Sequence, residues 1–109
     1  MDNEEYIKAL YNIFQTIYLK AESKKDQRLK TISLCIFNYI KHFSLKHKIS
    51  LQTDATVGAV NLAPIFAYIE ENSIELYDFS TIKMEDVDMT NNADIERFVL
   101  SHVYCLTQK

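Results

Sequence analysis

Glycine and proline are almost absent from this 109-residue sequence, which has one residue of each type and no tryptophan. Sheet proteins with many tight turns need both residues, so their scarcity favours helices joined by polar connections. A single glycine, Gly58, also excludes a glycine-rich phosphate-binding loop. No apolar run approaches the roughly 20 residues of a membrane-spanning helix.

Cysteine is scarce too. Cys35 and Cys105 lie far apart, each within an apolar helical pattern, which favours two reduced, buried thiols over a disulfide. The first five residues include three acidic side chains, unlike the basic start of a secretory signal. We therefore expect an intracellular, cytoplasmic location.

The composition is that of an ordinary globular protein, with 48% apolar and 25% charged residues. The length fits one domain, residues 1–109. Apolar side chains recur at the i, i+3, i+4, i+7 spacing of amphipathic helices, and the segments with this spacing are 3–22, 26–46, 55–71 and 91–107. We predict an all-α fold of four to five helices in a compact bundle or orthogonal array. Residues 72–90 form an irregular loop pinned by Ile74, Leu76 and Phe79.

Acidic or amide side chains stand where these helices begin, and the sequence predicts caps at Asp2, Asp54 and Asn91. Helix 26–46 is expected to be central and contacted on two sides, because three further side chains, Leu34, Cys35 and Phe37, widen its apolar stripe. Pro64 lies inside helix 55–71. Since it lacks a backbone donor, it is expected to kink or break that helix near residues 60–63.

Charge is distributed unevenly along the chain. Residues 1–50 contain nine Lys or Arg and five Asp or Glu, whereas residues 51–109 contain three and ten, and the net charge is −3. Basic side chains gather at 20–30 and at 41–48. They are typical either of solvated helix faces or of a surface for an acidic partner. Because the net charge is negative, nucleic-acid binding is the less favoured interpretation.

The sequence predicts no catalytic residue, no metal site and no bound cofactor. His42 and His47 are five residues apart, not at the i, i+4 spacing of a helical zinc site. Cys105 follows His102 by three residues, so both side chains fall on one helix face. A nucleophilic pair would need a third, orienting group, and none is apparent.

The segment Val57-Gly58-Ala59-Val60-Asn61-Leu62-Ala63-Pro64-Ile65-Phe66-Ala67 resembles the Asn-Leu-Ala-x-x-Phe-Gly/Ala motif of Rho-family GTPase-activating domains. The resemblance covers roughly residues 26–107, the C-terminal half of such a domain. It implies an all-helical fold that binds the switch regions of a small GTPase, with Asn61 as the contacting asparagine.

The chain departs from that family in several places. The family's catalytic arginine lies in a Gly-x-x-Arg-x-x-Gly setting, and the only arginines here, Arg28 and Arg97, are not in one. Such an arginine contributes about 10³–10⁵ in rate, so the sequence predicts binding without activation. Pro64 and Tyr68 also stand where the family usually has an aliphatic residue and a proline.

Three functional hypotheses remain open, and none of them is enzymatic. The first is a protein-interaction module, in its most specific form a truncated or degenerate GTPase-activating-like domain that binds a small GTPase. The second is a small helical modulator, of a viral kind, that binds a cellular protein through an apolar groove. The third is a structural homo-oligomer joined head to tail by its basic and acidic halves. The predicted partner-binding residues are Asn61, Lys24, Lys25, Arg28 and Lys41.

Overall fold

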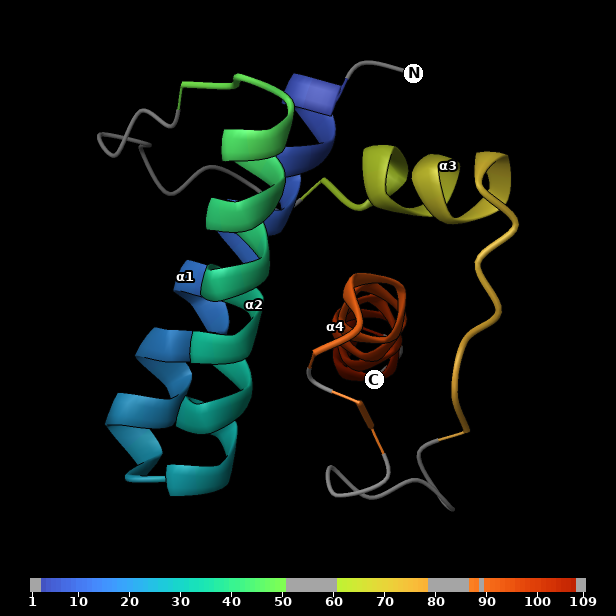
Figure 1. Ribbon diagram of the computed structural model, residues 1–109. Coiled ribbons are helices and arrows are strands. Elements are labelled where there is room, and N and C mark those ends of the chain that lie inside the picture. The colour runs from blue at the N-terminus through green and yellow to red at the C-terminus, as the bar shows by residue number, and fades with distance from the viewer. Residues whose placement is uncertain (1–2, 51–60, 79–86, 89, 108–109) are drawn as a thin grey trace. The chain divides into compact units, whose positions relative to one another are not determined.

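The computed structural model describes residues 3–50, 61–78, 87–88 and 90–107. Within these ranges the chain forms four α-helices and no strand (Figure 1), namely α1 (Asn3–Lys24), α2 (Gln27–Lys46), α3 (Ala63–Glu71) and α4 (Asn92–Thr107). The all-α prediction is confirmed. Contacts divide the chain into two compact units, residues 1–68 and residues 69–109, and each is described by itself. The single-domain prediction stays a prediction.

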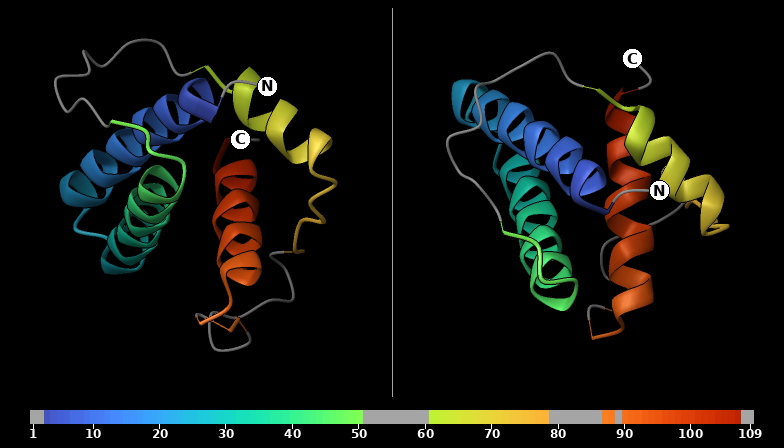
Figure 2. Two further views of the ribbon diagram at one scale, coloured as in Figure 1. Left: turned by 45° about the horizontal axis from the view of Figure 1, so that its top comes forward. Right: turned by 90° about the horizontal axis from the view of Figure 1, so that it is seen from above.

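The helices α1 and α2 form an antiparallel hairpin, and Figure 2 shows them side by side in both views. Residues that meet across the hairpin have numbers that add to nearly the same value, as antiparallel pairing requires: Asn3 meets His47, Tyr6 meets Phe43, and Phe14 meets Phe37. The side chains of the facing rows are at most 7% exposed, and they comprise Tyr6, Leu10, Ile13, Ile17, Ile32, Ile36, Tyr39, Ile40 and Phe43.

Three helix ends share one backbone geometry, in which a residue other than glycine adopts a left-handed conformation. These residues are Lys25 (φ 52°), Lys48 (φ 55°) and Ser73 (φ 51°). After each, the next amide donates to a carbonyl five residues back, as when Asp26 N donates to Ala21 O at 2.9 Å. This is the Schellman ending, which usually uses glycine. Here it forms in a chain whose single glycine lies elsewhere.

The start of α2 is fixed by Asp26, whose Oδ1 accepts from Leu29 N at 3.0 Å. The caps predicted from the sequence did not include Asp26. Leu34 corrects a second expectation. It is 45% exposed, so the widened apolar stripe of α2 is not covered at this position, although Cys35 and Phe37 are half-buried.

The interruption expected near residues 60–63 is confirmed in the form of a break, and not as a kink within a helix. Residues 61 and 62 are not helical, α3 begins at Ala63, and Pro64 therefore occupies its first turn. The first amides of a helix have no intrahelical acceptor, so the donor that proline lacks is not missed there. The expected helix start at residue 55 and the caps at Asp2 and Asp54 lie outside the described residues.

In unit 1, the residues of α3 up to Tyr68 are anchored to the hairpin by aromatic stacking. The Tyr68 ring lies parallel to the Tyr6 ring at 3.9 Å and meets Phe43 edge-on at 6.0 Å. Ile65 is fully buried. Tyr6 and Tyr39 pair their hydroxyls at 2.7 Å within the buried part of the hairpin. The core of unit 1 is therefore apolar with a tyrosine pair inside it.

Unit 2 contains α4 and the segment before it. Asn91 caps α4 as predicted, since its Oδ1 accepts from Ala93 N at 2.9 Å. The predicted stripe is buried at Phe98, Val99, His102 and Val103, and Leu100 and Ser101 are buried as well. The side chain of Leu106 is not among those described.

The irregular segment after α3 contacts α4 through Tyr77 and Glu75. Tyr77 N donates to Ser101 Oγ at 2.8 Å, the Arg97 guanidinium lies 3.8 Å from the Tyr77 ring centre, and Arg97 Nε donates to Glu75 O. Ile74 and Leu76 are half-buried, in agreement with the pinned loop, whereas Phe79 lies outside the described residues. No helix in the described part of the chain is long and apolar enough to cross a membrane.

Candidate protein-interaction surface

One side of the α1–α2 hairpin carries a row of half-buried aromatic rings. Phe14 of α1 stacks on Phe37 of α2 with ring centres 4.9 Å apart. Tyr11 and Tyr18, three and four residues either side of Phe14, each lie 5.8 Å from its ring. Residues at this spacing share one helix face, so the three rings of α1 form a ladder, and Phe37 extends it onto α2.

Exposed leucines border these rings on α2. Leu34 is 45% exposed and Leu45 is 77% exposed. They are separated by 11 positions in the sequence, which turns a helix by roughly 20° beyond three full turns, so both project to the same side. Lys41 lies between them on that side, with its Nζ 5.7 Å from the centre of the Phe37 ring.

We call this surface the aromatic face. It combines half-buried rings, exposed leucines and lysine amines on one side of the hairpin, and it consists of Tyr11, Phe14, Tyr18, Lys30, Leu34, Phe37, Lys41 and Leu45.

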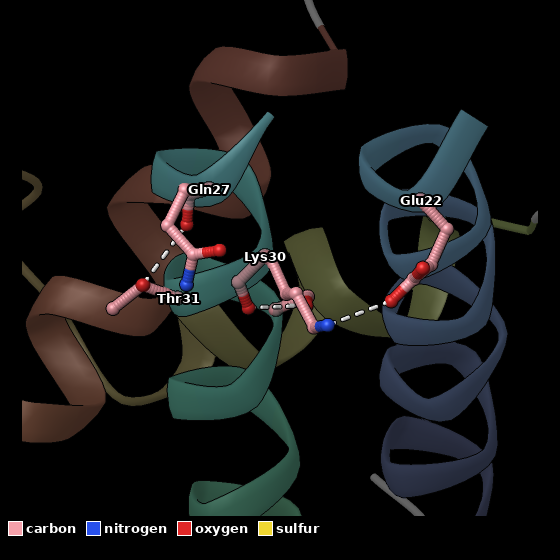
Figure 3. A network of polar contacts seen from close by, with 5 residues as sticks. Glu22, Gln27, Lys30 and Thr31 are labelled. Carbon is pink, nitrogen blue, oxygen red and sulfur yellow. Dashed lines mark hydrogen bonds and ion pairs between the residues drawn. The ribbon is translucent and has the colours of Figure 1, made fainter. Parts of the chain in front are cut away.

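The two lysines of the aromatic face differ in their partners. Lys30 Nζ lies 5.9 Å from the centre of the Tyr18 ring and 2.9 Å from Glu22 Oε1, and Figure 3 shows it reaching from α2 toward Glu22 on α1. The hydrogen bond and charge of Glu22 raise the pKa of Lys30, and those of Lys30 lower the pKa of Glu22. Lys41 makes no ion pair within the described ranges.

The hairpin brings together three of the five predicted partner-binding residues. Lys24 ends α1, Lys25 forms the turn and Arg28 lies in the first turn of α2, and all three are exposed. Lys41 is 13 positions further along α2 than Arg28, or about 20 Å at 1.5 Å per residue. We call Lys24, Lys25 and Arg28 the basic tip of the hairpin. It is therefore separate from the part of the aromatic face around Lys41.

Asn61, the fifth predicted residue, is exposed just before α3. Its Oδ1 accepts from Ala63 N at 3.1 Å. This bond satisfies one of the free amides at the helix start, as Asn91 does at the start of α4. The amide oxygen of Asn61 thus has a local structural role, while the residue remains open to solvent.

The groups that could carry nucleophilic chemistry are two cysteines and a histidine. Cys35 and Cys105 are unpaired, as predicted, but half-buried and not buried, and burial raises the pKa of the Cys35 thiol. His102 is 8% exposed, and its Nδ1 lies 3.1 Å from Phe98 O. No group of three potential metal ligands occurs among the described residues.

The sequence analysis did not identify the aromatic face, because Tyr11, Phe14 and Tyr18 follow the same apolar spacing of segment 3–22 as the residues that are buried. A signal was present in the residue types. The tyrosines have polar tips, and Leu34 lies off the main stripe of α2, with lysines four residues before it and seven residues after it. Periodicity alone does not distinguish a buried flank from a half-exposed one.

Comparisons with known proteins found no matching family model, no matching curated protein and no matching solved structure.

Proposed function

We propose that this chain is a non-enzymatic protein-interaction module whose binding surface is the aromatic face of the α1–α2 hairpin. The observation that carries the proposal is that half-buried rings and the exposed leucines Leu34 and Leu45 lie on one side of the hairpin. Exposed apolar surface bordered by polar groups marks interaction sites in soluble proteins.

The residue types of the aromatic face support a protein partner. Tyrosine and phenylalanine are enriched at protein interfaces, where large rings bury much area at little entropic cost. Lys41 supplies a cation at the Phe37 ring, and the basic tip adds three more. These charges favour an acidic partner surface. The proposal places the chain in the cytoplasm, since both thiols are unpaired.

The first experiment compares two double variants that carry the same change in charge. Leu34→Asp with Lys41→Glu alters the aromatic face, whereas Thr16→Asp with Lys46→Glu alters exposed positions elsewhere on the same helices. Proteins captured by the wild-type chain and by the control variant, but lost from the aromatic-face variant, would support the proposal. Equal capture by all three chains would contradict it, provided that circular dichroism shows equal helix content.

The most specific form of the proposal is binding to a Rho-family GTPase, which the resemblance around Asn61 implies. Purified GTPases loaded with GDP or with a GTP analogue serve as ligands in calorimetry. We expect binding without faster GTP hydrolysis, because neither arginine stands in the family's catalytic setting.

Two variants separate the roles of Asn61 in that experiment. Asn61→Ser removes the amide but keeps a hydroxyl able to cap α3, whereas Asn61→Ala removes both. GTPase binding that is lost in both variants would support a direct contact by the amide. If only Asn61→Ala weakens binding, the residue acts through the helix cap, and unchanged binding in both would exclude any role.

A further inference from the structure

We infer that the aromatic face binds an acidic amphipathic helix of a partner protein, laid along the seam between α1 and α2 so that three helices pack together. The inference rests on the proposed function and specifies the partner's chemistry. It is carried by the spacing of the residues on this face and by the charges that border it.

The spacing on α2 is that of a helix seam. Lys30, Leu34, Phe37 and Lys41 follow one another at intervals of four, three and four residues. These intervals average about 3.7 residues, close to the 3.6 residues of a helical turn, so the four side chains form one stripe that a neighbouring helix can pack against. An extended segment would meet side chains at a two-residue period instead.

The facing row on α1 has the same alternation, since Tyr11, Phe14 and Tyr18 are separated by three and four residues. The opposite rows of both helices are buried. The hairpin therefore has one seam that is buried and a second seam, the aromatic face, that is partly exposed. A helix is the element whose side chains fit between the rows of this second seam.

Charge determines which kind of helix fits. The described residues of the aromatic face include two ammonium groups, and the neighbouring carboxylate of Glu22 already pairs with Lys30. Lys41 lies between two exposed leucines and makes no ion pair among the described residues. A carboxylate of the partner would pair with Lys41 without displacing any ion pair of the described residues, whereas a basic helix would be repelled by it.

A second copy of this chain fits less well than a separate partner. The stretch from Lys30 to Leu45 is about 22 Å long at 1.5 Å per residue. The nine residues of α3 cannot span it, and α4 has six consecutive buried residues, Phe98 to Val103. Among the described residues, only the hairpin of a second copy is both long enough and free on an apolar side. It would bring its own Lys41 to a face that already carries Lys41, so an acidic helix is the better match in charge.

The test uses the full chain and three synthetic helical peptides that carry a fluorescent label. The first peptide has leucines at alternating three- and four-residue intervals with glutamates beside them. The second has lysines in place of the glutamates. The third has the same composition as the first, but its leucines are moved to positions that do not share one helix face. We expect the acidic amphipathic peptide to bind at least roughly tenfold more tightly than the other two, with affinity falling as salt rises.

Variants locate the binding. Lys41→Glu should lower affinity for the acidic peptide and raise affinity for the basic one, and Leu34→Ala should weaken both, whereas Lys46→Glu should have little effect. Leu34 and Lys41 are exposed, so these changes should leave the fold intact, which circular dichroism checks. Equal binding of acidic and basic peptides, or no effect of Lys41→Glu, would overturn the inference.

Failure of the inference can be distinguished from failure of the proposed function. If the acidic peptide does not bind but a captured protein still depends on Leu34 and Lys41, the face binds a partner of another kind and only the inference falls. If the chain alone forms a dimer that Leu34→Asp disrupts, a second copy occupies the face, and the acidic-helix inference falls as well.

Discussion

At the scale of single residues, the tyrosine pair inside the hairpin offers a sharp test of the core. Tyr6 is fully buried, Tyr39 is 7% exposed, and their hydroxyls are 2.7 Å apart. Losing one hydrogen bond costs about 0.5–1.5 kcal/mol net. Tyr6→Phe should therefore lower the free energy of unfolding by an amount in that range, measured by urea denaturation.

The matched control is Tyr11→Phe, because Tyr11 is half-buried on the aromatic face and its ring packs against Phe14. It should change the free energy of unfolding by less than about 0.5 kcal/mol. Equal effects of the two substitutions would show that the hydroxyl pair does not contribute to stability.

Individual residue roles were the part least accessible to sequence reasoning. Asn91 was predicted as a cap because it stands directly before a strong apolar period, and the structure confirms it. Asn61 has the same bonding role but was interpreted through its resemblance to a GTPase contact. Whether Asn61 is expected to cap a helix depends on where that helix begins. The apolar pattern continues upstream of Ala63, so the sequence did not reveal the helix start.

At the scale of helices, the left-handed ends give a second prediction. Lys48 and Ser73 adopt φ of 55° and 51°, where a side chain with a β-carbon costs about 1–2 kcal/mol and glycine costs little. Part of that gain is offset by the greater freedom of glycine in the unfolded chain. Lys48→Gly and Ser73→Gly should each raise the free energy of unfolding by about 0.5–1 kcal/mol.

The control for these substitutions is Ser23→Gly, in the last turns of α1, where the backbone is helical. It should lower the free energy of unfolding by about 0.5–1 kcal/mol. Thermal melts of the three variants in one buffer provide the comparison. If all three shift the melting temperature in the same direction, the left-handed conformation is not the cause.

Pro64 provides a third prediction, because its position in the first turn of α3 should make it nearly neutral. Pro64→Ala should change the free energy of unfolding by less than about 1 kcal/mol. Ala67→Pro, three residues later, should cost about 3 kcal/mol or more, because its amide lies within the helical bonding pattern. Hydrogen exchange of the α3 amides measures both. If Pro64→Ala lowered the free energy of unfolding by much more than about 1 kcal/mol, Pro64 would have a structural role beyond starting the helix.

The helices themselves were largely predictable, and the reason is periodicity. Three of the four predicted segments match α1, α2 and α4 within two residues at the described ends. The third segment, 55–71, ends at the same residue as α3, and its expected start lies outside the described residues. The kink or break expected near residues 60–63 is a break, since residues 61 and 62 are not helical. A proline is compatible with a kink and with a first turn, and only the backbone bonds of Leu62 O to Ile65 N and Phe66 N decide between them.

At the scale of the whole molecule, the uneven charge bears on self-association. Residues 1–50 carry a net positive charge and residues 51–109 a net negative one, which is the basis of the head-to-tail oligomer hypothesis. Attraction between exposed charges is screened over about 8 Å at physiological ionic strength. Charge attraction between copies should therefore be weak at physiological salt, and the aromatic face is proposed to bind an acidic helix and not a second copy. We expect the free chain to be a monomer at physiological salt.

Light scattering at low and at physiological ionic strength, over a hundredfold range of concentration, tests this last prediction. We expect the monomer mass of 12.8 kDa at physiological salt, with any increase confined to low salt, where opposite charges attract over about 30 Å at 0.01 M. An oligomer that persists at high salt would depend on apolar burial. If Leu34→Asp converted that oligomer to monomer, the aromatic face would be the contact between copies.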